Sequence, residues 1–443
     1  MFMYGRIILR LTVAAVLSTL ISFAAFSSPV GKNTCISYYG DNFGLYLSSV
    51  LRNNDEIKFL EFSLKKNMES IRKELAYQRM SAGISGGTEQ WIDGESSDGY
   101  TNTSTAEIYL RQQIELSGKF SAHMNYLIAG YKSAEFAFRD KVNTILARAA
   151  AAYVEASVSK ENVAIQEQVL ADRRESLRVT KHKCKEGMAP ELDVIRAGQQ
   201  VDDAEALLEN AGRNYANALA AMRKYCGEDF DVQPLELEKM YVEDFSLEKA
   251  LAERADLSAL RMDMLAAKMN GRLAAKGLTP TFQIRLSWGY ANYRLGRRDT
   301  GYDNYEGKLS FSADFPIFDG GRTKHQKKEG EYLILETERR IASLEENIAE
   351  EVDRAGNDLK SALLVERIKM RSRLAAQKTL HIAEEMYKDG LLGQIDLINA
   401  QESDQNAQTA YIQAFKDLAD ACIEQRRATG GFCGGDLPLT LSD

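Results

Sequence analysis

The second half of this 443-residue chain repeats its first half, and that duplication limits the possible folds more than any local motif. The clearest copy is the segment Cys184-Lys185-Glu186-Gly187, which returns 203 residues later as Tyr387-Lys388-Asp389-Gly390. Asp193 and Asp396 keep the same spacing. A fixed period of this length indicates that half of the fold was duplicated.

The repeat is expected to reach the ends of each half, where Asp41 corresponds to Asp244 at 203 residues and Gly118 to Gly320 at 202. We therefore divide the chain into a signal peptide, two repeats and a tail. The predicted segments are a signal peptide at 1–27; a first repeat at 28–229 with a helix, a β-hairpin at about 76–116, a long helix at about 118–183 and a helix at about 190–226; a second repeat at 230–430 with a helix at about 247–277, a β-hairpin at about 280–318, a long helix at about 322–388 and a helix at about 394–427; and a tail at 431–443.

The first residues predict a secretory leader. Arg6 and Arg10 supply positive charge, residues 11–26 are largely apolar, and Ala25-Phe26-Ser27 offers a small-residue cleavage site. An uncleaved anchor is the alternative, but sixteen residues fall short of the about 20 that a spanning helix needs. Removing the leader changes the net charge from −8 to 54 − 64 = −10, and an acidic exterior argues against a nucleic-acid partner.

The cysteines do not form the pattern of a disulfide scaffold, because five scattered residues are too few for a chain of this length. An odd number leaves at least one thiol free or paired between chains. Cys226 with Cys422 or Cys433 is the only pairing that we consider. The residues before Cys35 lack the apolar lead-in of a lipid-anchor signal.

Long helices account for most of the chain. From Gly118 to Lys183 the sequence is rich in Ala, Glu, Lys and Leu, contains no proline, and places small or apolar residues every seven positions. At a rise of 1.5 Å per residue, such a helix is about 100 Å long. Residues 322–388 repeat this pattern, and exact sevens over this length predict left-handed coiled-coil packing. A rod-shaped coiled coil would explain these helices, but it would not explain the strands.

Alternation of apolar and polar residues predicts four strands of about 10 to 12 residues, which is long enough for a tilted strand to cross an outer membrane. Polar loops are expected at 87–104 and 294–304. The predicted strands are a weakly patterned one near Gln78 to Gly86, one from Ala106 to Leu116 that is broken only by Gln112, one from Phe282 to Tyr290, and one from Lys308 to Phe315.

Aromatic residues lie at both ends of the second hairpin. Two aromatic girdles around an apolar band are typical of a membrane barrel, although alternation alone also fits one face of a soluble sheet. Four strands cannot close a barrel, and open strand edges in lipid leave backbone groups unsatisfied, so several copies must share one barrel. Three copies would give twelve strands and a lumen. The girdle residues are Tyr290, Tyr293, Tyr302 and Tyr305 near the loop, and Phe282, Phe315 and Phe318 at the other end.

The segment from Phe315 to Gly321, at the exit of the last strand, resembles the strand-to-helix segment of the TolC-like outer-membrane efflux proteins. Tyr387-x-x-Gly390 followed by Ile395-Asp396-Leu397 resembles the periplasmic helix tip of that family. The resemblance covers residues from about 41 to 430. It implies a mixed α/β membrane protein, a homotrimer whose twelve-stranded β-barrel in the outer membrane continues into a periplasmic α-helical barrel. A belt of mixed structure is then expected from residues 230–247 and from the segment after Arg427.

The resemblance also implies partners and a gate. The partners are a periplasmic adaptor (membrane fusion) protein and an inner-membrane pump, which would dock at the tips near Gly187 and Gly390. Asp396 matches the first aspartate of an acidic ring in the family's constriction, and the second falls at Asn399. Two glycines at the reversals are also expected for conformational reasons, because the turn needs a positive φ.

A polar contact between neighbouring tips is part of the same implication. Tyr387 matches the family's tip tyrosine and Asp193 the aspartate that it meets, whereas the family's partner arginine falls at Leu392. A bland alternative for Asp193 and Asp396 is that each is a helix N-cap that satisfies free amides.

The sequence contains no enzyme, cofactor or metal motif: it has no G-x-x-x-x-G-K-S/T, no H-E-x-x-H and no G-x-S-x-G. His182 and Cys184 are too few ligands for a metal site. We therefore predict a passive outer-membrane conduit for drugs and other small molecules, driven by a partner pump. Two alternatives are open: a type I protein-secretion conduit, which belongs to the same class, and a secreted trimeric coiled-coil adhesin or scaffold, which does not.

Overall fold

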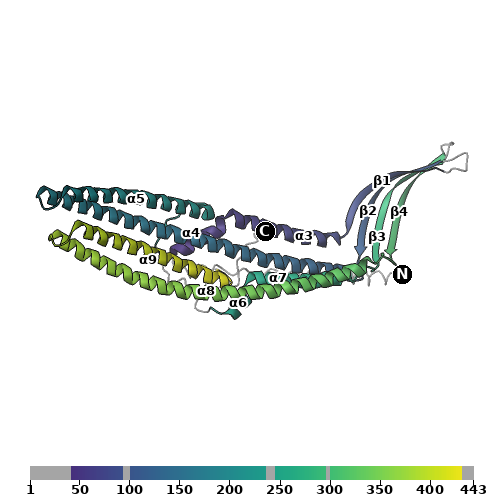
Figure 1. Ribbon diagram of the computed structural model, residues 1–443. Helices are drawn as coiled ribbons and strands as arrows, with labels where there is room; N and C mark the ends of the chain where they lie inside the picture. Colours follow the sequence, from purple (N-terminus) through teal and green to yellow (C-terminus); the bar gives the residue numbers. More distant parts are fainter. Residues whose placement is uncertain (1–40, 93–99, 236–244, 296–299, 432–443) are drawn as a thin grey trace.

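The computed structural model describes residues 41–92, 100–235, 245–295 and 300–431, so the predicted signal peptide, Cys35, Cys433 and part of the predicted belt lie outside the described residues. The molecule is elongated, with its strands at one end and helices over the rest of its length (Figure 1). In chain order the elements are α2 (Asp41–Asn53), α3 (Asp55–Tyr77), β1 (Ser81–Ile92), β2 (Tyr100–Ile114), α4 (Lys119–Lys185), α5 (Glu191–Cys226), α6 (Leu247–Glu253), α7 (Ala255–Ala274), β3 (Thr281–Leu295), β4 (Thr300–Asp314), α8 (Arg322–Lys388) and α9 (Gln394–Thr429).

The four strands form one antiparallel sheet in the order β1-β2-β3-β4, which confirms the predicted strands. Ile108 lies opposite Ile84 and Trp288 on the neighbouring strands, so apolar side chains share one face of the sheet. That face is uncovered in the single chain, where Ile84 is 80%, Trp288 60% and Leu309 73% exposed. A continuous apolar face of this kind requires an apolar environment outside the chain.

The strands are longer than the sequence predicted. β1 has 12 residues and the other three strands have 15 each, so they extend into the segments 87–104 and 294–304 that were expected to be loops. The reason is that polar residues with good strand propensity continue the ladder beyond the apolar band. Thr88 and Ser104, for example, face each other with their hydroxyl oxygens 3.2 Å apart.

The opposite face of the sheet is polar. Arg285 on β3 pairs with Glu107 on β2, and Ser85 on β1 donates a 3.0 Å hydrogen bond to the same carboxylate. The Arg285 guanidinium also lies 4.1 Å from the centre of the Tyr109 ring. An apolar face opposite a polar one is the pattern of barrel strands that separate lipid from a hydrated interior.

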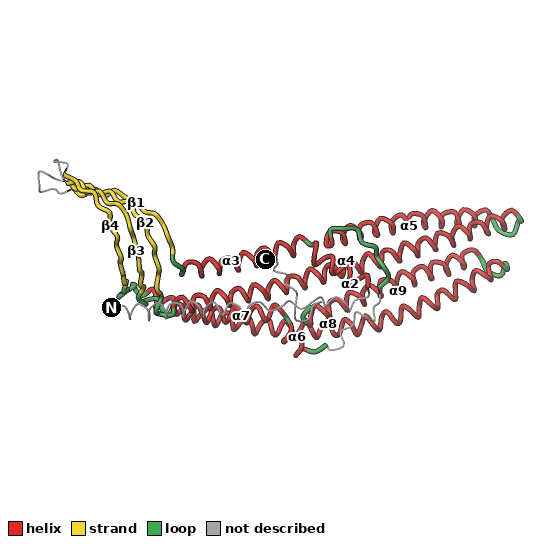
Figure 2. Tube along the Cα trace, turned by 180° about the vertical axis from the view of Figure 1, so that it is seen from behind, coloured by secondary structure: helices red, strands yellow, loops and turns green. Residues whose placement is uncertain are grey.

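The long helices form two hairpins of matching size. α4 and α8 have 67 residues each, α5 and α9 have 36 each, and the second helix of each pair begins 203 residues after the first. Figure 2 shows α4 returning as α5 and α8 returning as α9, with both turns at the end farthest from the sheet. Among the described residues, no helix is both long and apolar enough to cross a membrane.

The repeat has a different offset before the long helices. The single helix predicted at about 247–277 is two helices, α6 and α7, which meet at Arg254, and the first repeat has the same break at Asn54. These breaks are 200 residues apart, and β1 and β3 also begin 200 apart, so the predicted match of Asp41 with Asp244 does not hold. The second repeat therefore has three extra residues, which lie between β4 and α8: seven residues (315–321) form that connection, against four (115–118) between β2 and α4.

A hydrophobic core lies at mid-length, where α2, α4, α5 and α9 meet. The side chains of Tyr46 and Tyr153 are fully buried there, with ring centres 5.4 Å apart. Cys226 and Cys422 lie in this core as free thiols, so the pairing that the sequence left open between these two is not formed. Phe230, at the start of the predicted belt, packs on Tyr46 with ring centres 5.5 Å apart.

Candidate functional site at the helix tips

The two helix reversals have the same backbone geometry. In the first tip the amide of Met188 donates to the carbonyl of Lys183 at 2.8 Å, and the second tip repeats this bond at the same length 203 residues later. Gly187 and Gly390 have φ values of +77° and +75°, as predicted. Because a residue with a Cβ is strained in this conformation, these glycines allow each long helix to reverse within three to five residues.

Tyr387 joins the two hairpins at their tips. Its side chain is 6% exposed, and its hydroxyl oxygen lies 2.9 Å from Thr180 Oγ1 on α4. Thr180 Oγ1 lies 3.1 Å from Gln394 Oε1 on α9. Lys183 covers the ring of Tyr387, with Nζ 3.9 Å from the ring centre, and donates a hydrogen bond to the backbone carbonyl of Tyr387. One aromatic ring is thus held by polar groups from both hairpins.

The sequence predicted a different partner for this tyrosine. The hydroxyl of Tyr387 contacts Thr180, whereas the Asp193 carboxylate lies 3.7 Å from Arg196 in its own helix. Burial raises the pKa of Tyr387, the hydrogen bond with Thr180 lowers it, and the negative charge of Asp193 raises it again. With a raised pKa the phenol stays neutral near pH 7, so its hydroxyl is available as a hydrogen-bond donor.

Thr180 ends a row of buried polar residues on α4 that the sequence analysis missed. We call this row and its partners on α9 the polar seam. Arg173 donates to Gln401, and the side-chain amide of Gln405 donates to Gln166 at 3.3 Å. The α4 members are Ser159, Gln166, Arg173 and Thr180, and the α9 members are Gln394, Gln401 and Gln405.

A signal for the polar seam was present in the sequence. Its α4 members recur every seven residues, and they continue a heptad row that is apolar nearer the sheet, at Tyr131, Phe138, Ile145 and Ala152. Polar residues in such a row look like solvent-exposed positions when no partner helix is known. The structure shows that they are buried between two helices.

Asp193 and Asp396 are not N-caps. The N-cap positions of α5 and α9 are Pro190 and Gly393, neither of which makes a side-chain cap hydrogen bond, and each aspartate lies three residues further on in the first turn. There the carboxylate is favoured by the positive end of the helix dipole. Asp396 and Asn399 are exposed, so both side chains are accessible to a lumen or a neighbouring chain.

Each tip also exposes two large apolar side chains. Met188 and Leu192 are 66% and 52% exposed in the first tip, and Leu391 and Ile395 are 73% and 55% exposed in the second. Each pair is separated from the other by 203 residues. The duplication therefore presents the same small apolar surface twice at the end of the molecule farthest from the sheet, which is the pattern of a protein contact site.

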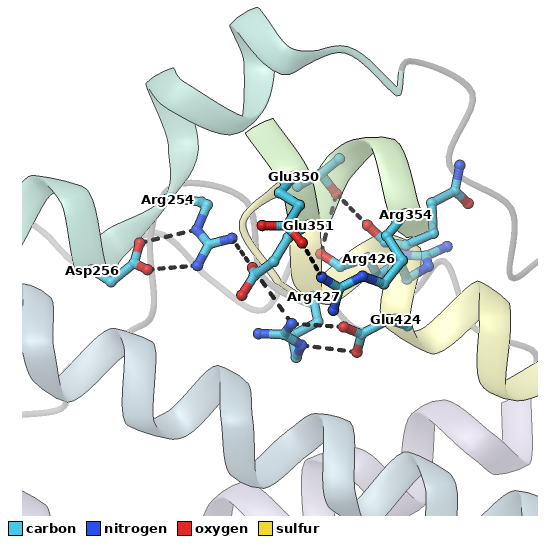
Figure 3. A network of polar contacts seen from close by, with 10 residues as sticks. Arg254, Asp256, Glu350, Glu351, Arg354, Glu424, Arg426 and Arg427 are labelled. Atoms are coloured by element: carbon cyan, nitrogen blue, oxygen red, sulfur yellow. Dashed lines mark hydrogen bonds and ion pairs between the residues drawn. The ribbon is translucent and has the colours of Figure 1, made fainter. Parts of the chain in front are cut away.

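A second polar cluster lies at mid-length, where α7 meets α8 and α9 (Figure 3). Arg254 is almost fully buried and binds Asp256 through two bonds of 2.6 and 3.1 Å and also pairs with Glu351 of α8. Arg427 of α9 lies 3.5 Å from the same Glu351 and binds Glu424 through two bonds. Burial opposes the charge of Arg254, but its two carboxylate partners outweigh burial, and its pKa is raised.

This cluster has a structural explanation. Every arginine in it has a carboxylate partner, and together the pairs fix the α6–α7 break against the second hairpin. Within the part of the chain that the structure describes, no three His, Cys, Asp or Glu side chains lie close enough together to hold a metal ion. We therefore place the functional site at the tips.

A sequence profile described as outer membrane efflux protein matches residues 47–228 and 246–431, which is most of the chain. The chain belongs to the outer membrane efflux protein family. The two matched segments correspond to the two halves of the duplication. Membership explains both the uncovered apolar face of the sheet, which stands in the outer membrane, and the long helices, which span the periplasm.

Relatives of the efflux family share both sequence and fold with this chain. Outer membrane efflux protein BepC of Brucella suis is 25% identical over 351 residues, which cover 77% of this chain and 75% of BepC. Outer membrane protein TolC of Vibrio cholerae is 21% identical over 305 residues, covering 66% of this chain and 69% of TolC.

Solved channels have the same architecture. The Campylobacter jejuni CmeC outer membrane channel superposes with a TM-score of 0.75 at 16% identity, covering 92% of this chain and 89% of CmeC. The open state of the Neisseria gonorrhoeae MtrE outer membrane channel gives a TM-score of 0.74 at 17% identity, covering 92% and 95%. The chain is thus an outer-membrane efflux channel protein, as its sequence predicted.

Proposed function

We propose that three copies of this efflux protein form a passive conduit for small molecules, with a twelve-stranded barrel in the outer membrane and a gate at the helix tips. The observation that supports the trimer is the open sheet: within the described residues, the outer edges of β1 and β4 have no partner strand, although the sheet's apolar face needs lipid. Unpaired backbone groups in lipid cost several kcal/mol each, and pairing β4 with β1 of the next copy removes that cost.

The helices supply matching surfaces for neighbouring copies. α8 exposes large apolar side chains along its periplasmic half, including Leu364 at 58% and Ile368 at 52%. α5 exposes Leu207 at 44%. In a ring of three copies these helices would pack against each other, because α4 and α9 already occupy the inner positions between the two hairpins.

We assign the adaptor contact to the duplicated apolar pairs Met188 with Leu192 and Leu391 with Ile395, which lie beside Gly187 and Gly390. An inner-membrane pump would supply the energy through that adaptor, because the sequence has no phosphate-binding loop. The role of Asp193 in this proposal is to hold negative charge near Tyr387 inside the tip.

The gate is assigned to Asp396, with Asn399 on the same helix face three residues later. Three Asp396 carboxylates around one axis would attract cations and repel anions at the entrance. Replacing Asp396 with alanine should therefore lower cation selectivity and weaken block by multivalent cations in planar-bilayer recordings. Asn399→Asp, which adds a second acidic ring, should change both quantities in the opposite direction.

Asp203→Ala is the matched control, because it removes the same charge from an exposed position on α5 away from the tip. Unchanged ion selectivity in Asp396→Ala would remove the gate role. The absence of discrete channel openings in the unaltered protein would remove the conduit itself and favour the adhesin alternative.

A further inference from the structure

The connection between β4 and α8 differs from its counterpart in the first repeat. It has seven residues instead of four, and its side chains Phe315, Ile317 and Phe318 are 61%, 92% and 85% exposed. The shorter connection exposes one large apolar side chain, Leu116, at 72%. The three extra residues of the second repeat therefore come with a cluster of uncovered apolar side chains.

A basic run follows directly. Residues 322–328 carry four cations and no acid, a charge of +4 in a chain whose net charge is −8. All four are exposed, and none forms an ion pair with a described residue; they are Arg322, Lys324, Lys327 and Lys328. The corresponding start of α4 has a single lysine, Lys119, before its second turn. Glu329 and Glu331 come next on α8, so the positive surface is confined to its first two turns.

Cations at this position have no intramolecular advantage. The first turn of α8 contains no acidic residue, and the N-terminal end of a helix already carries partial positive charge. Four added cations oppose that dipole. An external anion would compensate for both the dipole and the cations.

We propose that residues 315–328, which we call the interface segment, bind anionic phospholipid head groups of the outer-membrane leaflet nearest the helices. The segment continues the lipid-facing side of the sheet, because the Phe315 ring packs edge-on against Phe282 at 5.9 Å, and Phe282 stacks on Phe311 at 6.0 Å. The apolar side chains enter the boundary of the acyl chains, and the cations reach the phosphates.

The dimensions of the segment fit this role. From Arg322 to Lys328 the helix rises by about 9 Å, which is comparable with the thickness of one head-group layer. A basic residue near an anionic surface contributes about 1 kcal/mol. The inference requires that the sheet stands in the membrane, but it does not depend on the gate proposed at the tips.

The experiment uses the full chain in lipid vesicles with Ile317→Trp as a fluorescent reporter, in a background where Trp91 and Trp288 are replaced with phenylalanine. Vesicles contain either brominated phosphatidylglycerol or brominated phosphatidylcholine at the same mole fraction, and quenching measures which lipid lies beside residue 317. We expect phosphatidylglycerol to associate at least about fivefold more strongly than phosphatidylcholine, which is the effect of one lysine. The triple variant Lys324→Gln, Lys327→Gln, Lys328→Gln should bring this ratio close to one.

The matched control removes three exposed lysines at the other end of the molecule: Lys181→Gln, Lys185→Gln, Lys388→Gln should leave the ratio unchanged. Equal quenching by both lipids in the unaltered charge background would overturn the proposal. Absence of quenching by either lipid would also overturn it, because it would show that a neighbouring copy covers the segment. Bilayer conductance of each variant verifies assembly, so loss of the channel is distinguishable from loss of lipid preference.

Discussion

Asp420 on α9 is a residue whose environment works against its charge. Burial raises its pKa to about 6, Lys416 lowers it, and Asp417 and Glu155 raise it further. The folded chain therefore binds this proton more tightly than the unfolded chain does, and the free energy of unfolding falls as pH rises from about 4 to about 6. Asp420→Asn should remove this loss, so the variant should be about 1 to 2 kcal/mol more stable at pH 7.5.

Chemical unfolding of the detergent-solubilised protein at pH 5 and pH 7.5 measures this difference. Asp417→Asn is the control, because Asp417 is exposed on the same helix and its replacement should leave the pH dependence in place. Equal stabilisation of the Asp420→Asn variant at both pH values would contradict the assignment.

At the scale of elements, the sequence predicted the long helices well and their neighbours less well. Heptads, the tip glycines and the scarcity of proline are local signals, so α8 was predicted at 322–388 and is observed there. Strand ends depend on cross-strand partners such as Thr88 and Ser104, which a single segment does not reveal. The break at Asn54 had a local signal that was missed, because Asn followed by Asp55 and Glu56 is a helix-start pattern inside an apparent helix.

That break supplies the element-scale prediction. Asn54 is 7% exposed; its Oδ1 accepts from the amides of Glu56 and Ile57 at 3.0 and 3.1 Å, and its Nδ2 donates to the carbonyl of Tyr225 on α5 at 3.1 Å. Asn54→Ala removes the cap of α3 and leaves buried groups unpaired, so it should lower the free energy of unfolding by about 2 kcal/mol. Asn54→Asp keeps the cap oxygen but loses the bond to α5, and should lie between the two.

Thermal unfolding by circular dichroism ranks these variants. Asn53→Ala serves as the control, because Asn53 precedes the break, is exposed and bonds only surface partners, Ser49 and Glu228. If Asn54→Ala proved no less stable than Asn53→Ala, the break would be fixed by packing of α2 and α3 rather than by its cap.

At the scale of the whole molecule, the row on α4 that faces the second hairpin changes character along its length. Nearer the sheet it is apolar, with Tyr131 and Phe138 buried, and from Ser159 to Thr180 it is the polar seam. The sequence could predict that the two hairpins meet, because both carry heptads. It could not predict which polar groups meet, because that depends on how α4 and α9 are aligned.

An apolar contact resists separation along its whole area, whereas a hydrogen-bonded contact can exchange its partners for water at a net cost of about 1 kcal/mol per bond. The hairpins should therefore separate at the tips while remaining joined nearer the sheet. Thr180→Val removes the hydroxyl that Tyr387 and Gln394 share, and should raise the open probability of single channels in planar bilayers. Thr379→Val is its control, because the Thr379 hydroxyl is exposed and bonds only its own helix, at Ala375.

The size of the effect also tests how the copies are coupled. If the three tips of the proposed trimer open together, three bonds are lost at once, and about 3 kcal/mol corresponds to an increase on the order of 100-fold in the ratio of open to closed channels. If each tip opens alone, the increase stays near fivefold, the effect of about 1 kcal/mol. An open probability that did not change would show that Thr180 and Tyr387 do not hold the hairpins closed, because a closing contact contributes to the equilibrium only if it is broken in the open state.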